Sequence, residues 1–447
     1  MKKATHDLLL RTVKSLNAIL MTLPFAAAWF FYYGDRILVP YYRYGDWVIL
    51  LLFLLLYVNF GKIYDAFLVS LTRITEMVYS QSLTAVISDF FMYVVTVLLS
   101  GHVPNPLPLL AALAGQFMLS ITWSTLAHKW YFHTFPPKRT AVVYDMRQDL
   151  APLLGEYGLE KKFHILLRIS IDEWLEQPGL LDDMEVVFFS GIRSHDRNVL
   201  LKHCLSKGID AYVIPRVGDL LMSSAKTMHI LHLPILRVGR YNPGFFYLFA
   251  KRVFDIVTAV VSLVLLSPLF LITAIAIKAC DGGPVFYKQV RLTKDGKRFH
   301  IHKFRSMRMD AEKDGVRLSS GESDPRVTPV GRVIRRFRID ELPQLFDVLC
   351  GSLSVVGPRP ERPEIAEEYC KQIPEFNLRL QAKAGLTGYA QVYGKYNTTP
   401  YDKLQMDLMY IAHPSLIEDL RICFATVKTL FMPESTEGVE EGQTTAL

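Results

Sequence analysis

The stretch VFDIVTAVVSLVLLSPLFLITAIAI, residues 253–277, decides how the C-terminal half of this chain folds. It is long enough for a transmembrane helix, which takes about 20 apolar residues. Ser267 and Pro268 interrupt it near the middle; proline removes a backbone donor and kinks a helix, and a neighbouring serine can satisfy the freed carbonyl. Basic residues flank both ends, and a full crossing would carry the whole basic C-terminal region across the membrane. The pattern therefore predicts a re-entrant helix over about residues 252–280 that breaks at Ser267-Pro268 and returns to the same face, with an ordinary kinked span as the alternative.

Further apolar runs lie upstream, within residues 1–135. Each is long enough, or nearly so with its flanks, to cross a bilayer, and the first has no signal-peptide cleavage pattern, so it is expected to be a retained anchor. Lys and Arg residues precede the first run, separate the second from the third and follow the fourth, whereas the loop 101–106 has none. The positive-inside rule therefore places both ends of the region in the cytoplasm, although Arg36 and Arg43 weaken the pattern. The four runs lie near residues 19–33, 47–60, 83–99 and 107–126.

The overall composition is that of a membrane protein with a soluble part. Of its 447 residues, 51% are hydrophobic, and the formal net charge is +7. A positive charge suits a protein that lies against anionic lipid or handles phosphates. Nucleic acid is the second candidate on charge alone, but no nucleic-acid signature motif supports it. The five cysteines are scattered and form no CxxC pair, which argues against a disulfide framework or a zinc site and suits a reducing compartment.

The middle segment, residues 136–247, has the pattern of a small α/β unit. Its β-rich runs alternate with polar, helix-compatible stretches, which favours a parallel sheet. A dinucleotide site would need a G-x-G-x-x-G turn after the first strand, but the sequence there is Asp145-Met146-Arg147-Gln148. We therefore expect no nucleotide site and favour a role in interaction or oligomerisation. The expected strands cover residues 141–144, 163–169, 185–189 and 211–214.

Two adjacent acids, Asp340 and Glu341, stand in the basic run RRFRIDELP at residues 335–343. Pro343 suits the first turn of a new helix, so the pair would lie at a helix N-terminus, where the dipole and free N–H groups favour phosphate. Two carboxylates there could hold Mg²⁺, and a carboxylate could attack a metal-neutralised diphosphate. Three arginines ahead of the pair would share one helical face: Arg332, Arg335 and Arg336.

Each of these features also has an ordinary explanation. Arginine-rich amphipathic helices at a membrane surface often only bind lipid headgroups, and Lys303 and Arg305 could be surface charges. The segment 357–360 could be a rigid turn, and Asp340 could simply cap a helix, the commonest task of an Asp in that position. Their combination close to a membrane-embedded helix favours a catalytic site for phosphate chemistry.

From about residue 251 to residue 431 the chain resembles the bacterial polyprenyl-phosphate hexose-1-phosphate transferases, also called monotopic phosphoglycosyl transferases. The motifs that carry the resemblance are KRVFD at 251–255, Ser267-Pro268, PVF at 284–286, KFRSM at 303–307, DELPQL at 340–345 and GPRP at 357–360. The N-terminal spans and the α/β unit resemble the long-form members, which start capsule, exopolysaccharide or O-antigen repeat units. The fold implied is a membrane α-helical bundle (1–135), a cytoplasmic Rossmann-like α/β unit (136–247), a mainly α monotopic catalytic domain with a re-entrant membrane helix (248–435) and a polar tail (436–447).

The resemblance also implies a two-step reaction. Asp340 would attack the sugar-bearing phosphate of a UDP-sugar and release UMP, and polyprenyl (undecaprenyl) phosphate would then take the sugar phosphate from the aspartate. Glu341 would orient the metal, Mg²⁺, or accept a proton from the lipid phosphate. The family further suggests a homodimer in contact with lipid in the bacterial inner membrane, with the catalytic domain on the cytoplasmic face. The residues at substrate-binding positions are Lys303, Arg305, Arg335, Arg338, Pro358, Arg359 and Pro360.

Residues 389–397 depart from many relatives, which carry a tryptophan-containing version of this segment. Because the segment bears on sugar choice, the sequence leaves the hexose open among glucose, galactose and N-acetylhexosamine. A non-catalytic scaffold for polysaccharide assembly is the alternative, but it would be expected to lose Asp340, Glu341 or Lys303, and all three are present. A transporter would need more ionisable residues inside the spans than Asp89.

Overall fold

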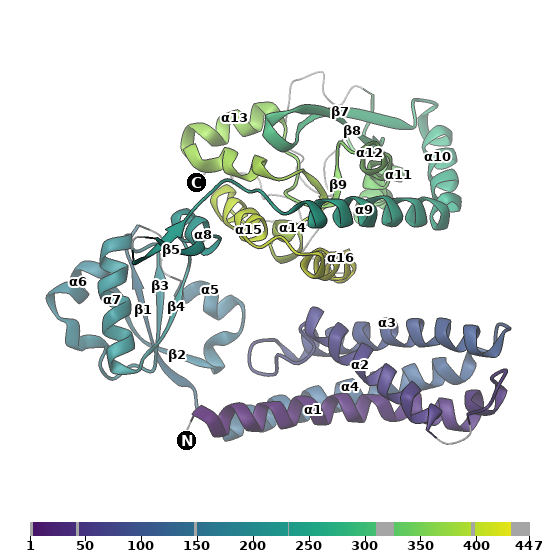
Figure 1. Ribbon diagram of the computed structural model, residues 1–447, viewed down its shortest axis with the longest axis horizontal. Helices are drawn as coiled ribbons and strands as arrows, with labels where there is room; N and C mark the ends of the chain where they lie inside the picture. Colours follow the sequence, from purple (N-terminus) through teal and green to yellow (C-terminus); the bar gives the residue numbers. More distant parts are fainter. Residues whose placement is uncertain are drawn as a thin grey trace. The chain divides into compact units, whose positions relative to one another are not determined.

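The structure is a computed structural model that describes residues 3–41, 44–146, 150–230, 232–309, 326–394 and 398–430. The chain separates into two compact units, Met1–Ile214 and Pro215–Leu447, each with hydrophobic clusters of its own (Figure 1). Some residues used above lie outside the described part: Arg43, Arg147, Gln148, residues 395–397 of the segment expected to select the sugar, and the expected tail at 436–447.

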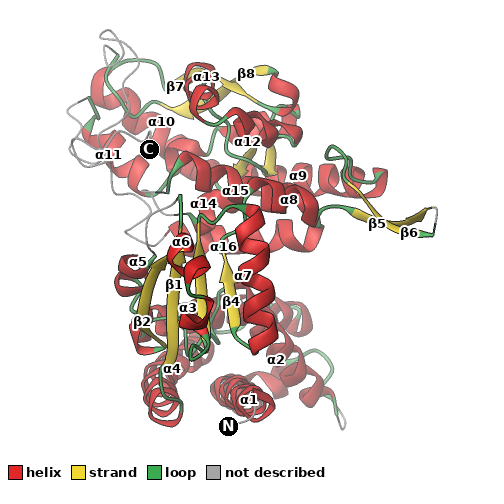
Figure 2. Cartoon of the chain, turned by 90° about the vertical axis from the view of Figure 1, so that its left-hand side faces the viewer, coloured by secondary structure: helices red, strands yellow, loops and turns green. Residues whose placement is uncertain are grey.

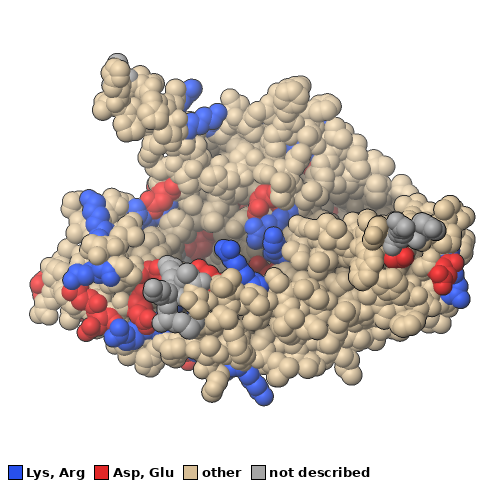
Figure 3. Space-filling view, turned by 60° about the horizontal axis from the view of Figure 1, so that its bottom comes forward, with Lys and Arg blue, Asp and Glu red and all other residues tan. Residues whose placement is uncertain are grey.

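A bundle of long apolar helices opens the first unit. Among the described residues, four helices in this region are long and apolar enough to cross a membrane, as the apolar runs predicted. Each extends beyond the run that predicted it, and much of the molecular surface in Figure 3 is uncharged. The helices are α1 (Lys3–Ala28, continued by a π-helical turn Trp29–Tyr33), α2 (Gly45–Ile63), α3 (Ile74–Ser100) and α4 (Leu107–Thr134).

The bundle is packed in the manner of a membrane protein. Its interior holds fully buried aromatic rings such as Phe25 and Phe53, which stack with centroids 4.5 Å apart. Helix α3 buries small and polar side chains, including Asp89, and exposes large apolar ones such as Phe90 and Leu98. This distribution is expected where lipid covers the outer face, because small and polar residues allow helices to approach and to hydrogen-bond.

A parallel four-stranded sheet of order β2-β1-β3-β4 follows the bundle. Its strands coincide with the four β-rich runs of the sequence, which confirms the expected parallel sheet. Helices α6 (Ile171–Glu176) and α7 (Ser194–Lys207) lie on one side of the sheet and α5 (Ala151–Glu156) on the other (Figure 1). The strands are β1 (Lys138–Tyr144), β2 (Phe163–Ser170), β3 (Val186–Ser190) and β4 (Asp210–Val213).

The second unit begins earlier than the boundary at residue 248 that the sequence suggested. Helix α8 (Val217–Ser223) contributes Val217 and Leu220 to the core of this unit, which also contains Leu404 and Leu408. A two-stranded hairpin, β5 (Lys226–Ile230) and β6 (Leu233–Arg237), comes next and extends away from the helices around it (Figure 2).

The long apolar stretch forms two helices, α9 (Phe245–Leu265) and α10 (Ser267–Asp281), that meet at 62°. The break lies at the residues that predicted it. Pro268 occupies the first turn of α10, and the Ser267 hydroxyl donates to the Val264 carbonyl at 2.8 Å, which satisfies an acceptor at the end of α9. By length and composition the pair is either one broken span or a re-entrant loop.

The rest of the unit mixes helices with short strand pairs and is therefore less helical than expected. Antiparallel strands β7 and β8 form a hairpin, and β9 pairs with β10 in parallel. The elements are β7 (Phe286–Leu292), β8 (Arg298–Phe304), α11 (Pro329–Arg336), α12 (Gln344–Cys350), β9 (Ser354–Val356), α13 (Pro363–Gln372), β10 (Gly385–Thr387), α14 (Tyr389–Tyr393), α15 (Pro400–Ala412) and α16 (Leu416–Leu430).

Glycines make the β9–β10 junction possible. A Cβ on Gly357 would lie 2.3 Å from the Lys383 carbonyl oxygen, and one on Gly385 would lie 2.1 Å from the Gly357 nitrogen. Real Cβ atoms do not approach so closely, so both positions require a residue without a side chain. The GPRP turn, which carries Arg359, is therefore fixed by backbone-to-backbone packing.

Candidate active site

The acid pair is presented by a tight turn between two helices. Thr328 caps α11 by accepting a hydrogen bond from the Gly331 N–H at 2.9 Å. After α11, Arg338 adopts a left-handed conformation with φ of 55°, which is uncommon for a non-glycine residue. A 3₁₀ turn, Ile339–Glu341, then carries both acids, and Pro343 immediately precedes α12 rather than lying in its first turn. Strained backbone of this kind concentrates at functional sites.

Glu341 is clamped between two cations. The Lys303 Nζ lies 2.8 Å and the Arg359 Nη2 lies 2.9 Å from the same oxygen, Oε1. Lys303 comes from β8 and Arg359 from the GPRP turn, so three separate segments meet at this carboxylate. Burial alone would raise the pKa of Glu341, but Arg359 and Lys303 hold it well below its usual range. Glu341 is therefore an ionised group at any physiological pH.

The pKa of Asp340 is shifted in the opposite direction. Burial, assisted by the neighbouring charge of Glu341, raises its pKa to about 6 against the opposing effect of Lys303, Arg335 and Arg338. The predicted cations thus do surround the acid pair, but their attraction does not outweigh the loss of solvation. A carboxylate with a raised pKa is more basic, and hence more nucleophilic, than an ordinary aspartate.

The arginines of α11 are not equivalent. Arg335 is half-buried and acts on Asp340, whereas Arg332 and Arg336 are exposed. The expected common face of three arginines therefore divides into one residue at the acid pair and two at the surface. Val333 is exposed as well, and Ile334 alone of the apolar residues near it is buried in the core with Ile277 and Phe304.

Arg305, although expected among the substrate-binding residues, is engaged elsewhere. Its guanidinium pairs with both carboxylate oxygens of Asp281, the last residue of α10, with Nη1 at 2.8 Å from Oδ2. Gly283 packs beneath it, where a Cβ would lie 2.6 Å from Nη1. In this ion pair Arg305 is buried and Asp281 is partly exposed, and it ties the end of α10 to the end of β8.

The GPRP turn is held from behind by buried charges. Arg379, which is 4% exposed, donates from Nη2 to the Arg359 carbonyl at 2.9 Å and forms an ion pair with Asp407 at 2.6 Å. The Pro360 carbonyl accepts from Arg291 at 3.2 Å, and the Pro358 carbonyl accepts from the backbone N–H of Gly385 at 2.9 Å. These contacts fix the backbone from which Arg359 reaches Glu341.

The strand that carries Lys303 is held in a similar way. Asp347 on α12 is buried and accepts from the backbone N–H of His302 at 2.9 Å and from its Nδ1 at 2.6 Å. One carboxylate thus binds both the main chain and the side chain of the residue next to Lys303. The lysine and the arginine that clamp Glu341 are each supported by a buried charged residue.

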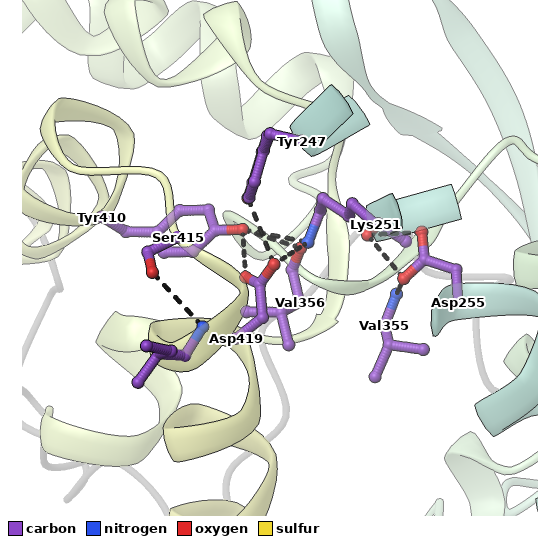
Figure 4. A network of polar contacts seen from close by, with 10 residues as sticks. Tyr247, Lys251, Asp255, Val355, Val356, Tyr410, Ser415 and Asp419 are labelled. Atoms are coloured by element: carbon purple, nitrogen blue, oxygen red, sulfur yellow. Dashed lines mark hydrogen bonds and ion pairs between the residues drawn. The ribbon is translucent and has the colours of Figure 1, made fainter. Parts of the chain in front are cut away.

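The KRVFD motif joins α9 to the body of the unit. The Lys251 ammonium donates to Asp419 at 3.0 Å and to the Tyr410 hydroxyl at 3.1 Å, and Tyr410 and Tyr247 donate to the same carboxylate at 2.7 and 3.1 Å (Figure 4). One turn further along α9, Asp255 accepts from the Ser354 hydroxyl and from the Val355 N–H (Figure 4). These residues therefore hold α9 against the rest of the unit.

Sequence reasoning missed the supporting residues Arg379, Asp407 and Asp347. None belongs to the motifs that carried the resemblance. Helical periodicity held a usable signal for Asp407, because it stands between Leu404 and Leu408 on the buried face of α15. A charged residue on such a face needs an oppositely charged or hydrogen-bonding partner, and in this structure the partner of Asp407 is Arg379.

The acid pair has the oxygen ligands that Mg²⁺ prefers. Mg²⁺ is commonly bound by one or two carboxylates together with water and substrate phosphates. Within the described parts of the chain there is no group of three or more His, Cys, Asp or Glu side chains that could hold a metal. Since Oε1 of Glu341 already faces Lys303 and Arg359, Asp340 and the second oxygen of Glu341 are the atoms that fit Mg²⁺.

Comparison with known proteins bears on the same region. A family model described as "Bacterial sugar transferase" matches residues 246–433. UDP-N-acetylgalactosamine-undecaprenyl-phosphate N-acetylgalactosaminephosphotransferase of Aeromonas hydrophila is 39% identical over 233 residues, 52% of this chain and 54% of that protein. UDP-glucose:undecaprenyl-phosphate glucose-1-phosphate transferase of Klebsiella pneumoniae is 36% identical over 254 residues, 55% of this chain and 54% of that protein. Exopolysaccharide production protein PSS of Rhizobium leguminosarum bv. phaseoli is 39% identical over 186 residues, 40% of this chain and 92% of that protein.

The fold and the site define a membrane-associated protein whose acid pair is set among cations. Because the Rhizobium protein is matched over 92% of its length, and the family model covers the segment with the acid pair, the chain belongs to the bacterial sugar transferase family. The chain spans about half the length of the Aeromonas and Klebsiella relatives. Their names differ in the sugar, N-acetylgalactosamine in one and glucose in the other.

Proposed function

We propose that this protein transfers a hexose-1-phosphate from a UDP-sugar to polyprenyl phosphate, with undecaprenyl phosphate as the natural acceptor, and so starts the repeat unit of a bacterial polysaccharide. The observation that carries the proposal is the unequal pair: Glu341 is neutralised by two cations, while Asp340 beside it has a raised pKa of about 6. A basic carboxylate among cations suits attack on a phosphorus atom, where positioning and electrostatics supply most of the rate.

The reaction proceeds in two displacements. A carboxylate oxygen of Asp340 forms a bond to the sugar-bearing phosphorus, the diphosphate P–O bond breaks, and UMP leaves with the bonding electrons. A phosphate oxygen of the polyprenyl lipid then attacks the same phosphorus. The bond to Asp340 breaks, and the free carboxylate returns with a lipid diphosphate-sugar as product. Nucleophilic catalysis of this kind divides one difficult transfer into two easier ones.

Lys303, Arg335, Arg338 and Arg359 balance the negative charge of the phosphates. Glu341 keeps Lys303 and Arg359 in place through its ion pairs. Because its pKa lies well below the usual range, Glu341 is a poor proton acceptor, which favours the orienting role over the proton-accepting one. Mg²⁺, held by Asp340 and Glu341, would neutralise the diphosphate.

The membrane geometry follows from the same proposal. The bent α9–α10 pair enters and leaves the membrane on the cytoplasmic face of the inner membrane, which brings a soluble nucleotide sugar and a lipid phosphate to one interface. The bend, the basic residues on both flanks and the Arg305–Asp281 tie at the end of α10 support this arrangement. The parallel sheet would act as a Rossmann-like interaction unit, and we expect a homodimer.

The test is UMP release from a UDP-sugar with Mg²⁺ and polyprenyl phosphate, using the full chain in lipid nanodiscs. Asp340→Asn should abolish turnover and should also abolish the mass increase of the intact protein that a sugar-phosphoryl aspartate produces. A panel of UDP-glucose, UDP-galactose and UDP-N-acetylhexosamines identifies the sugar. Turnover that survives in Asp340→Asn would exclude Asp340 as the nucleophile.

A further inference from the structure

A group of three lysines lies in the first unit, away from the acid pair in sequence. Lys14 is on α1, Lys138 begins β1, and Lys162 precedes β2. The backbone N–H of Lys138 donates to the Lys162 carbonyl at 2.8 Å, so these two residues are neighbours on adjacent strands. All three side chains are half-buried. We refer to these three residues as the lysine cluster.

The cluster carries more positive charge than its surroundings neutralise. Burial, together with the charges of Lys138 and Lys14, lowers the pKa of Lys162 to about 8. Lys138 has a carboxylate partner, Asp210, at 3.3 Å. Elsewhere in the described chain, no carboxylate lies within ion-pairing distance of Lys14 or Lys162, and the Lys162 ammonium instead donates to the Ser70 hydroxyl at 3.0 Å. Like charges brought together in a partly desolvated place favour a bound anion.

The position of the cluster indicates what kind of anion it would meet. Lys14 lies in the first turns of a membrane-spanning helix, where Leu16 and Ile19 are 47% and 53% exposed in a manner suited to lipid contact. Lys138 follows the end of α4 by a few residues, and Ser70 lies between α2 and α3. The lysines therefore gather where the helices of the bundle leave the apolar layer, at the depth of lipid headgroups.

We propose that Lys14, Lys138 and Lys162 form a binding site for the phosphate of a membrane lipid at the end of the helical bundle, with the Ser70 hydroxyl as an additional hydrogen-bonding group. Ammonium groups bind phosphate as compact charges, and a lipid phosphate would relieve the repulsion among them. The ligand class is a phosphate ester embedded in a bilayer, which both an anionic phospholipid and polyprenyl phosphate can supply. The site shares no residue with the acid pair.

Lysine reactivity in the full-length protein provides the first test. The chain is placed in nanodiscs of phosphatidylcholine, alone or with phosphatidylglycerol, and acylated with an amine reagent before mass spectrometry. With phosphatidylcholine alone, Lys162 should react faster than the exposed Lys202, because a lowered pKa leaves more neutral amine. Phosphatidylglycerol should slow Lys162 by roughly fivefold or more, the effect of one favourable contact with an anionic surface, and should leave Lys202 unchanged.

Further lipid conditions in the same acylation experiment distinguish the possible sources of the bound phosphate. Protection of Lys162 by polyprenyl phosphate in a phosphatidylcholine disc, without protection by phosphatidylglycerol, would assign the site to the acceptor lipid. Protection by both would assign it to lipid phosphates in general. Protection by inorganic phosphate alone, or reaction rates that do not depend on the lipid, would overturn the proposal.

Substitutions provide the second test. Native mass spectrometry should find fewer retained anionic lipids on Lys162→Gln and on Lys14→Gln, by roughly fivefold in affinity for each lysine removed. Lys202→Gln changes the net charge equally from an exposed position on α7 and is the matched control. Lys14→Gln provides a variant outside the sheet should Lys162→Gln fold poorly. Equal lipid retention in Lys14→Gln and Lys202→Gln would contradict the proposal.

Discussion

At the scale of single residues, two carboxylates that are neighbours in the sequence acquire opposite acidities. Glu341 receives two cations on one oxygen, so its charged form is stabilised. Asp340 loses solvent without a comparable direct contact, so its charged form is disfavoured. The difference comes from the turn that presents them, because consecutive residues in a 3₁₀ turn point in different directions. In the proposed reaction, this asymmetry separates Asp340, the group that reacts, from Glu341, the group that holds Lys303 and Arg359 in place.

This asymmetry predicts opposite effects of two isosteric substitutions on stability. The pKa of Asp340 is raised, so its contribution to stability is present below its unfolded pKa and lost as the pH rises through about 6. At pH 7.5, Asp340→Asn should therefore leave the free energy of unfolding unchanged or raise it by up to about 3 kcal/mol. Glu341→Gln should lower it by about 1–3 kcal/mol, because Lys303 and Arg359 lose their shared acceptor. Thermal unfolding measures both, and a larger loss in Asp340→Asn would contradict this account.

The same pKa sets the pH dependence of the proposed reaction. Only ionised Asp340 can attack or bind Mg²⁺, so at subsaturating Mg²⁺, where the metal-free site sets the protonation, kcat/KM should be constant above about pH 7 and should fall about tenfold per pH unit below pH 6. Lys303 opposes the rise of the pKa, so Lys303→Met should move the acid limb to higher pH as well as lower the rate. Initial rates of UMP release across the pH range measure this. A profile that stays level down to pH 5 would show that Asp340 is not held at a raised pKa.

Substitutions of Arg379 can separate its effect on the position of Arg359 from its effect on the stability of the protein. Arg379→Met leaves Asp407 buried without its partner, which should cost about 3–5 kcal/mol, whereas removing both charges costs less. The double variant Arg379→Met/Asp407→Leu should therefore recover most of the stability. It should not recover kcat, because the contact from Arg379 to the Arg359 carbonyl is still missing. Full recovery of both quantities would mean that Arg379 has no role beyond pairing with Asp407.

At the scale of elements, the bent pair α9–α10 decides on which side of the membrane the second unit lies. Cys280 is exposed at the end of α10, and Ser206 is exposed on α7 of the first unit. If α9–α10 is re-entrant, an impermeant thiol reagent should label Cys280 and a Ser206→Cys variant from the same side, each tested as the single cysteine of the chain. Inside-out vesicles and intact spheroplasts provide the two sides. Labelling from opposite sides would show that the pair crosses the membrane.

The elements also show what a pattern of residues can and cannot predict. The break at Ser267-Pro268 and the four strands of the sheet were predictable, because proline and β-rich runs act on the local backbone. The β9–β10 pair of the second unit was not expected, because these two strands are short and far apart in the sequence. Their pairing depends on the close approach at Gly357 and Gly385, which becomes evident only in three dimensions.

At the scale of the whole molecule, the motifs named the residues and the structure shows which of them lie around the acid pair. Lys303, Arg335, Arg338 and Arg359 surround the acid pair as the motifs suggested. Arg305 carried the same expectation and instead binds Asp281, which a motif cannot show because the partner lies outside it. Arg379 and Asp347 were missed for the converse reason, since they act on main-chain atoms of their neighbours. The motifs therefore predicted which residues lie near the acid pair better than they predicted what each residue binds.

The network around Lys251 has a consequence for the order in which the protein can be built. Its partner Asp419 lies 168 residues later in the chain. At typical translation speeds, roughly 10–30 s separate the emergence of the two from the ribosome. During that interval α9 has been made without the partner of its ammonium, so the unit can close around Lys251 only after α16 has been made. Nascent chains released before α16 would therefore carry the Lys251 ammonium without Asp419, the carboxylate that pairs with it in the complete chain.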